Sequence, residues 1–174
     1  NSRFGYNRKD SASELRNASY LLHELMHSAS QGGNLDLSVD AMGDGRIDPY
    51  HQAVLLEMGR WLAANGEAVY GTVEAPHQQN TTSPEGALIY FTASLDGARL
   101  FATATSWPGS SFSLTLHGRA CPPPGGVSLL GEPTLAIKTS CAEGKIRMDL
   151  GDWPAGGVDA GPAARHAWVF RLSW

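Results

Sequence analysis

The chain has 174 residues, of which 42% are hydrophobic and 17% are charged, and its formal net charge is −4. These values are typical of a folded globular protein and exclude an intrinsically disordered chain. A mildly acidic chain lacks the basic surface that binds nucleic acid or anionic membranes, and no apolar run approaches the roughly 20 residues of a membrane-spanning helix. We therefore expect neither nucleic acid nor a membrane among its partners.

The N-terminal part of the chain first predicts a helix. Asp10 or Ser11 is its expected N-cap, and the glycine pair at residues 32–33 is expected to end it. Between these points apolar side chains recur at helical spacing: Leu15, Ala18, Leu22, Leu25, Met26 and Ala29. One face of this helix should therefore be buried.

A strand and a second helix should follow. In residues 34–39, leucine and valine side chains alternate with polar ones, which predicts a strand. Asp48 followed by Pro49 is a typical helix start, and Asn65 followed by Gly66 is a typical helix end. Helix, strand and helix with short connections indicate a slice of a parallel α/β fold.

After Pro76 the hydrophobic pattern changes to a period of two, interrupted by glycine and proline. Seven short segments alternate in this way: residues 88–93, 99–105, 112–116, 127–130, 135–139, 145–150 and 166–172. So many short strands close together predict a β-sandwich. The polar stretch at residues 77–86 is the natural boundary between the two halves.

Four residues bear on the compartment in which the chain folds. Cys121 and Cys141 lie in the strand-rich half, where facing strands can bring them within bonding distance, but two free thiols fit the sequence equally well. Asn17 and Asn80 each begin an Asn-x-Ser/Thr sequon, which is a weak indication of a secretory route. Neither cysteine has the spacing of a metal or redox motif.

Residues 23–27 read His-Glu-Leu-Met-His, a pattern that on a helix can hold zinc with the glutamate as base. Counting about 100° per residue puts His23 beyond the edge of the apolar stripe and His27 nearly opposite its centre. The longer zinc motif also fails, because Gly33 stands where a third histidine is needed, although Glu57 is a conceivable third ligand. We interpret both histidines as solvated, and a zinc peptidase is the least favoured alternative.

The stretch from Asp40 to Asp48 imitates a calcium-binding loop, with Asp44 at the fifth position and a glycine at the sixth. Met42 offers no hard oxygen at the third position, and His51 replaces the bidentate glutamate at the twelfth. We interpret the stretch as a glycine-bearing turn before a helix.

Several short blocks follow one another in the order and spacing of a known enzyme family. Those of the first half are Arg-Phe-Gly-Tyr-Asn at 3–7, Gly-Gly-Asn at 32–34, Gly-Arg-Ile at 45–47, Gly-Arg-Trp-Leu at 59–62 and Asn-Gly-Glu-Ala-Val-Tyr-Gly-Thr at 65–72. Those of the second half are Trp-Pro at 107–108, Leu-Leu-Gly at 129–131 and Ala-Trp-Val-Phe-Arg-Leu at 167–172. Together they resemble the C-terminal half of glycoside hydrolase family 29, the α-L-fucosidases.

This resemblance implies a two-part fold. Residues 1–75 would be the C-terminal end of a catalytic TIM (β/α)8 barrel, residues 76–86 a linker, and residues 87–174 an antiparallel β-sandwich with a structural role. In the family, the two catalytic carboxylates come from earlier barrel strands. We therefore assign no catalytic residue to this chain and expect both of them upstream of Asn1.

The resemblance also implies an activity: hydrolysis of terminal α-linked L-fucose from oligosaccharides or glycoproteins, with retention and without a cofactor or metal ion. The segment alone should be inactive without its missing N-terminal barrel portion. A homo-oligomer and a secreted, periplasmic or lysosomal location are compatible with this reading. The alternative from another class is a carbohydrate-binding or structural β-sandwich module without chemistry.

The opening block holds the one substrate-binding residue that the resemblance implies. The family's aromatic residue at the position of Phe4 lies against the fucose ring near its methyl group, where an apolar wall suits a 6-deoxy sugar. A role for Phe4 in core packing is the alternative. In the strand predicted at residues 34–39, Ser38 replaces the family's Asn, and Asp40 followed by Ala41 replaces Gly-Pro. These departures put the exact substrate in question.

Overall fold

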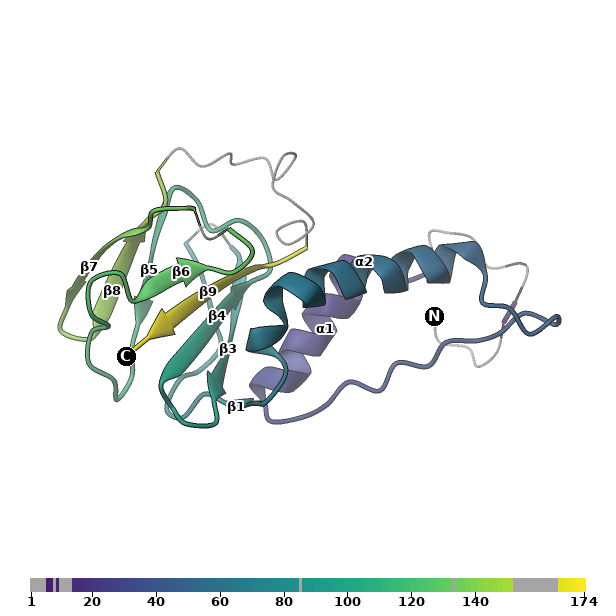
Figure 1. Cartoon of the computed structure of the whole chain (residues 1–174), viewed down its shortest axis with the longest axis horizontal. Helices are drawn as coiled ribbons and strands as arrows, with labels where there is room; N and C mark the ends of the chain where they lie inside the picture. The colour runs from purple at the N-terminus through teal and green to yellow at the C-terminus, as the bar shows by residue number, and fades with distance from the viewer. Residues whose placement is uncertain (1–5, 8, 10–13, 85, 133, 152–165) are drawn as a thin grey trace.

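The computed structural model describes residues 6, 7, 9, 14–84, 86–132, 134–151 and 166–174. Two helices lie together at one end of an elongated molecule, and two β-sheets form the other end (Figure 1). The helices are α1 (Ala18–Ser30) and α2 (Pro49–Asn65), and a short 3-10 turn, η2 (Gly66–Ala68), follows α2. None of the helices in the described residues is long and apolar enough to cross a membrane.

Each helix begins at a side chain that caps its first turn. Oδ1 of Asn17 accepts a hydrogen bond from the backbone N–H of Tyr20 at 2.9 Å, so α1 begins at Ala18. The prediction that this helix starts at Asp10 or Ser11 is therefore wrong. The predicted start of α2 is confirmed, because Asp48 is its N-cap and Pro49 its first residue.

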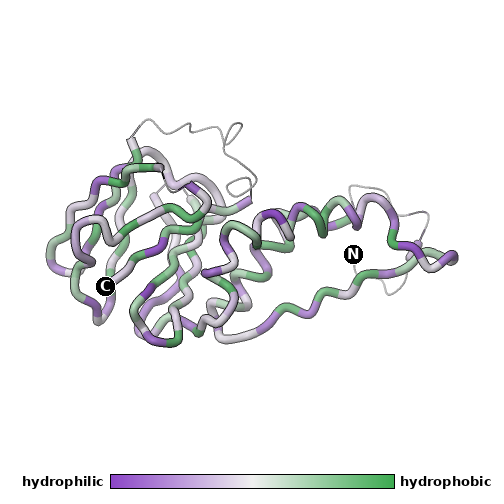
Figure 2. Tube along the Cα trace, in the orientation of Figure 1, coloured by the Kyte–Doolittle hydropathy of each residue, from purple (hydrophilic) through white to green (hydrophobic). Residues whose placement is uncertain are grey.

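The segment between the helices is extended but joins no sheet among the described residues. Residues 33–40 carry no ladder, and the one bridge beyond them joins Ala41 to Ile47. The alternation expected for a strand is nevertheless present, since Leu35, Leu37 and Val39 are half-buried. Figure 2 shows this alternation along the single tube that leaves α1 and runs beside the helices to a distant turn. The segment thus has the pattern of a strand without its neighbours.

The strands form two antiparallel sheets. The six-stranded sheet has the order β1-β3-β4-β9-β6, with β2 also paired to β3, and the three-stranded sheet has the order β5-β8-β7. Their bounds are β1 Thr72–Glu74, β2 Thr81–Thr82, β3 Leu88–Ser94, β4 Arg99–Ala104, β5 Ser111–Thr115, β6 Val127–Leu129, β7 Lys138–Ala142, β8 Lys145–Asp149 and β9 Trp168–Ser173. The antiparallel β-sandwich predicted from the period of two is confirmed. β2 falls within the predicted linker 76–86, and the division into domains stays a prediction.

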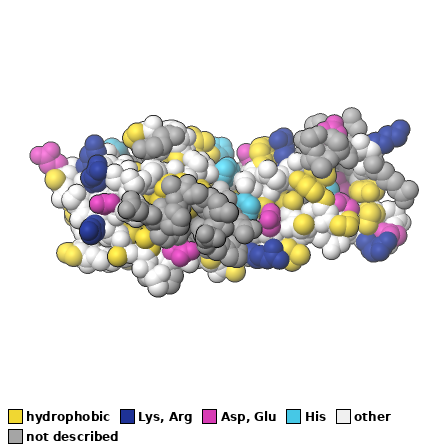
Figure 3. Space-filling model, turned by 90° about the horizontal axis from the view of Figure 1, so that it is seen from above, with side chains coloured by type: hydrophobic (Ala, Val, Ile, Leu, Met, Phe, Trp, Pro, Cys, Tyr) yellow, Lys and Arg dark blue, Asp and Glu magenta, His cyan; other side chains and the backbone are white. Residues whose placement is uncertain are grey.

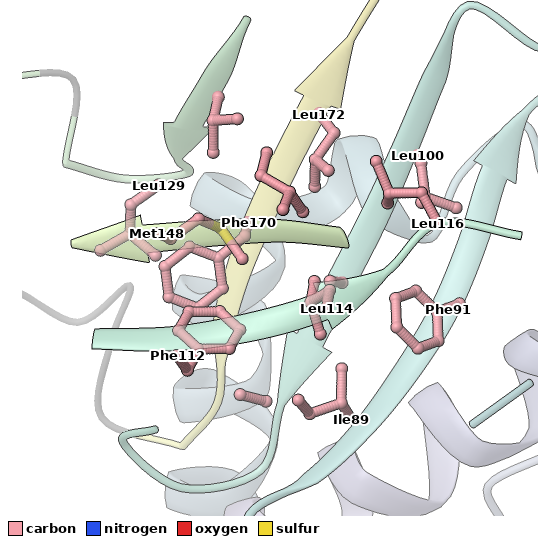
Figure 4. Close-up of a cluster of buried hydrophobic side chains, with 14 of the residues drawn as sticks. Ile89, Phe91, Leu100, Phe112, Leu114, Leu116, Leu129, Met148, Phe170 and Leu172 are labelled. Carbon is pink, nitrogen blue, oxygen red and sulfur yellow. The ribbon is translucent and has the colours of Figure 1, made fainter. Parts of the chain in front are cut away.

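The sandwich core fills the space between the two sheets. Side chains of both sheets point toward one another in Figure 4, where the Phe112 and Phe170 rings lie 4.8 Å apart between their centroids. Alternate residues of β3, β4, β5, β6, β8 and β9 supply this core, as the pleat of a strand requires. Large, fully buried members are Phe91, Leu100, Leu114, Leu129, Ile146, Met148 and Phe170.

The helices cover the other face of the six-stranded sheet, so this sheet is buried on both sides. Phe101 and Val169 belong to a second core cluster, which they share with the buried residues of α1 and α2. Trp61 of α2 is fully buried there, and its indole Nε1 donates a hydrogen bond to the carbonyl of Ala167 at 3.0 Å. The molecule therefore has a helix layer and two sheet layers.

The hairpin of β7 and β8 differs from the prediction by three residues. The sequence pattern placed a strand at residues 135–139, whereas β7 runs from Lys138 to Ala142 and pairs with β8. Glu143 and Gly144 form the tight turn, with φ of 51° and 74° respectively. A two-residue turn with both φ values positive fixes the register, and Glu-Gly is a weaker signal for it than Asn-Gly.

Cys121 and Cys141 form a disulfide, with 5.9 Å between their Cα atoms. The bond ties the loop after β5 to β7, so it joins two segments 20 residues apart. The sequence left pairing and free thiols open, and the structure decides for pairing.

We expect the double replacement C121S and C141S to lower the free energy of unfolding by about 3 kcal/mol, because the cross-link restricts the unfolded chain. Denaturant unfolding of the oxidised chain and the variant measures the difference. The wild-type chain in a reductant is the matched control and should unfold at the same midpoint as the variant. An unchanged midpoint in both would contradict the prediction.

Candidate functional site

The predicted sugar contact, Phe4, lies outside the described residues, as does most of its block. Tyr6 and Asn7, the last residues of that block, are described and half-buried. Oδ1 of Asn7 accepts a hydrogen bond from the backbone N–H of Lys9 at 3.1 Å. The role of Phe4 therefore stays a prediction.

The departures from the family pattern, Ser38 and Asp40, lie at the end of the extended segment at residues 34–40. Ser38 is exposed and Asp40 is half-buried, so the two polar departures from the family pattern differ in environment. The backbone of this segment has no ladder partner among the described residues, which leaves its N–H and C=O groups available for pairing. Neighbouring strands would cover these groups and the half-buried side chains together.

An ion pair between two of its own side chains stabilises the turn after Asp40. Asp44 accepts hydrogen bonds from the guanidinium group of Arg46 at 2.6 and 2.8 Å. The side-chain bond to Arg46 lowers the pKa of Asp44 below its ordinary value. The carboxylate is therefore engaged by arginine within the turn, which agrees with the interpretation as a glycine-bearing turn.

The carboxylate of Asp48 is engaged in hydrogen bonds at the start of α2. One of its oxygens accepts hydrogen bonds from the backbone N–H groups of Tyr50, at 2.9 Å, and His51, at 3.2 Å, and the other is bonded to the His51 ring. Burial opposes the charged form, but the bonds from His51 and Tyr50 outweigh it and lower the pKa of Asp48 below 3.8. This carboxylate serves as a helix cap.

We expect the variant D48N to weaken the acid sensitivity of the fold. The pKa of Asp48 is lower in the folded chain, so its carboxylate contributes stability above its ordinary pKa of 3.8, and that contribution is lost as pH falls through the folded pKa. Asparagine caps a helix almost as well but does not titrate. Melting temperatures measured from neutral pH to about pH 3 should fall less in D48N than in the wild type. D36N, at an exposed position, is the control and should follow the wild type.

The two histidines of residues 23–27 lie in different environments. Nε2 of His23 is 2.9 Å from the carbonyl oxygen of His166, and this part-buried contact corrects the interpretation of His23 as solvated. His27 is exposed, with Nε2 at 2.8 Å from the side-chain amide of Gln31. His23 is half-buried because His166 packs on that side of α1. Within the described part of the chain, no three His, Cys, Asp or Glu side chains form a group that could hold a metal ion.

A polar cluster that the sequence did not reveal joins α1, α2 and the start of β9. The hydroxyl of Ser19 lies 2.8 Å from Nδ1 of His166, and Nε2 of His166 lies 3.9 Å from a carboxylate oxygen of Glu57. Figure 3 shows histidine and acidic side chains gathered where the helices meet the sheets. Ser19 and His166 are 147 residues apart, so only the fold brings them together. The cluster connects the helix layer to the sandwich.

The chain has known relatives. The family model described as Alpha-L-fucosidase matches residues 1–67. Tissue alpha-L-fucosidase of Homo sapiens is 34% identical over 107 residues, which are 60% of this chain and 22% of that protein. Alpha-L-fucosidase of Branchiostoma floridae is 32% identical over 171 residues, which are 97% of this chain and 35% of that protein. The chain spans between a fifth and about a third of the length of the curated relatives that it matches.

Solved structures share the fold. An alpha-fucosidase of Thermotoga maritima, in complex with a mechanism-based inhibitor, superposes with a TM-score of 0.79 at 22% identity, over 98% of this chain and 37% of that one. A family 29 alpha-L-fucosidase of Bacteroides thetaiotaomicron gives a TM-score of 0.73 at 17% identity, over 97% of this chain and 35% of that one. At such identities the likeness concerns the fold. With the sequence relatives, it confirms the resemblance to a C-terminal portion of the α-L-fucosidases.

Proposed function

We propose that this chain, a relative of the α-L-fucosidases, is the C-terminal portion of a glycoside hydrolase that removes terminal α-linked L-fucose with retention of configuration. The match of residues 1–67 to the family model is the observation that carries the proposal, because it covers the helical half, to which the end of the catalytic barrel is assigned. The superposition on solved fucosidases over 98% of the chain supports it.

In the complete protein, residues 34–39 form the last strand of a (β/α)8 barrel, flanked by α1 and α2. The alternating burial of the segment and its lack of a ladder partner in the described residues support this placement. In such a barrel the catalytic groups lie at the C-terminal ends of the strands. Asp40 would then face the pocket side of the last strand, and the missing N-terminal barrel portion is an obligatory partner.

Retention requires two carboxyl groups about 5 Å apart, one as the nucleophile that forms a glycosyl ester and one as acid and then base. We assign both to sequence upstream of Asn1. The contribution of this chain to the pocket is Phe4, whose ring forms an apolar wall against the methyl group of fucose. The substrate is a fucosylated oligosaccharide or glycoprotein.

The disulfide supports an oxidising compartment for the protein. Bonds such as Cys121–Cys141 persist in secreted, periplasmic and lysosomal proteins and are rare in the cytosol. Two curated relatives carry the names "Tissue alpha-L-fucosidase" and "Plasma alpha-L-fucosidase", which fit a lysosomal or secreted location.

Hydrolysis by the complete parent protein tests the proposal. The parent should release a chromogenic leaving group from an α-L-fucoside at the same rate with and without a chelator, whereas this chain alone should be inert. A parent with no activity on α-L-fucosides would overturn the proposal. A zinc enzyme would be favoured instead if a chelator abolished the activity of the parent and if replacing His23 abolished it as well.

The alternative of a carbohydrate-binding or structural module rests on the sandwich having a core of its own. Fucose binding by the isolated sandwich, without hydrolysis by the parent, would support that alternative.

A further inference from the structure

Two sequons lie on the described surface, Asn17-Ala18-Ser19 and Asn80-Thr81-Thr82, and the fold uses their asparagines differently. Both side chains belong to exposed residues. Asn80 uses both ends of its amide, because Nδ2 donates to the hydroxyl of Ser30 at 2.9 Å and Oδ1 accepts from the N–H of Phe91 at 3.2 Å. That amide joins the end of α1 to β3.

Asn17 uses only the oxygen of its amide. Oδ1 accepts from the N–H of Tyr20 as the cap of α1, and among the described residues no hydrogen bond involves Nδ2. In an N-glycan the sugar is attached to Nδ2 of the asparagine, and Oδ1 remains free to accept a hydrogen bond. A glycan at Asn17 therefore preserves the helix cap, which is the one polar contact that its side chain makes in the described structure.

The residues that flank Asn17 also leave room for a glycan on its side chain. Ala18 is 1% exposed and packs into the helix–sheet core, whereas Asn17 and Tyr20 face outward, Tyr20 with 40% of its surface exposed. The guanidinium carbon of Arg16 lies over the Tyr20 ring at 4.1 Å, so this exposed turn is ordered by its own side chains. An attached glycan would extend from the surface and away from the core.

The environment of the Ser19 hydroxyl bears on when during folding a glycan could be transferred to Asn17. The hydroxyl of Ser19 is bonded to His166 in the folded chain, and His166 lies beside the C-terminal strand β9. A transferase that recognises this hydroxyl must act before β9 is in place. Glycan transfer would therefore come before the helices dock on the sheet.

We propose that Asn17 is an N-glycan acceptor, with a lipid-linked oligosaccharide of the secretory pathway as the donor. The new bond joins Nδ2 to the anomeric carbon of the first sugar, the amide nitrogen loses one proton, and lipid pyrophosphate leaves with the electrons of the broken C–O bond. The Cys121–Cys141 disulfide is an independent sign that the chain matures in an oxidising compartment, where this donor is found. The site does not depend on the fucosidase activity.

The test is glycopeptide mass spectrometry of the complete parent protein secreted from a eukaryotic host. The peptide with Asn17 should carry an N-glycan in the wild type. N17D and S19A should lose that glycan and no other, while N17D keeps a capping oxygen at the start of α1. S19T is the matched control, because it keeps both the sequon and a hydroxyl beside His166.

N80Q shows whether the second sequon contributes, since any glycan that disappears in this variant belongs to Asn80. An unmodified Asn17 peptide in secreted wild-type protein would overturn the proposal, whether or not Asn80 is modified. Loss of the Asn17 glycan in S19T would also contradict it. Fucoside hydrolysis, measured on the same samples, reports separately on the proposed function.

Discussion

The variant W61A should lose about 3–5 kcal/mol of the free energy of unfolding, because it empties the centre of the helix–sheet core. Trp61 is fully buried between α2 and the six-stranded sheet, and it is among the largest buried side chains of the described chain. The variant also leaves the carbonyl of Ala167 without the indole donor at 3.0 Å. Denaturant unfolding followed by circular dichroism measures the loss.

Two matched variants separate packing from hydrogen bonding. W61F keeps most of the ring volume and should lose about 1–3 kcal/mol, since the Ala167 carbonyl is then unsatisfied. L56A, on the same helix, should change stability by less than about 0.5 kcal/mol, because Leu56 is 60% exposed. A W61A variant as stable as L56A would show that the helices do not depend on this core.

Most strands of the sandwich could be predicted from the sequence because they carry a local signal, whereas the short β1 and β2 were not predicted. In β8, Ile146 and Met148 are buried while Lys145 and Arg147 are exposed, and this period of two identifies both the strand and its inner face. The shift of β7 shows the limit, since an alternating pattern fits two registers until the Glu143 turn selects one.

The helical half shows why local signals were insufficient for the rest. Asp10, Ser11 and Asn17 are all residues that cap helices, and the pattern does not say which of them starts α1. His23 was expected in solvent because its own helix offers no reason to bury it. Its environment comes from the residue His166, 143 positions later, and no periodicity within α1 carries that information.

The block at residues 65–72, which resembles the family most closely, has a structural role here. Glu67 binds two arginines, Arg99 of β4 at 2.7 Å and Arg171 of β9 at 3.1 Å. A Cβ atom on Gly66 would lie 2.9 Å from the Tyr70 ring, so only glycine fits that position without a shift. Residues 65–72 therefore connect the helices to the sheet. Part of the resemblance to the family reflects this structural role.

The variant F4A in the complete parent protein should lower the preference for fucose over its 6-hydroxy counterpart, L-galactose. If the Phe4 ring faces the fucose methyl group, its loss removes an apolar contact worth about 1–3 kcal/mol, or about 10–200-fold in relative kcat/KM. Measuring kcat/KM on matched aryl α-L-fucosides and α-L-galactosides gives the ratio directly. F4L, which keeps an apolar side chain, should retain most of the preference.

A core-packing role for Phe4 would give a different result. The melting temperature of F4A would then fall, and the kcat/KM values of both glycosides would drop together, leaving their ratio unchanged. Under the proposed role the melting temperature changes little while the ratio falls, because the side chain contacts the sugar and not the core. An unchanged ratio of the two kcat/KM values would show that Phe4 does not line the pocket. Asp40 would then be the next candidate for a substrate contact of this chain.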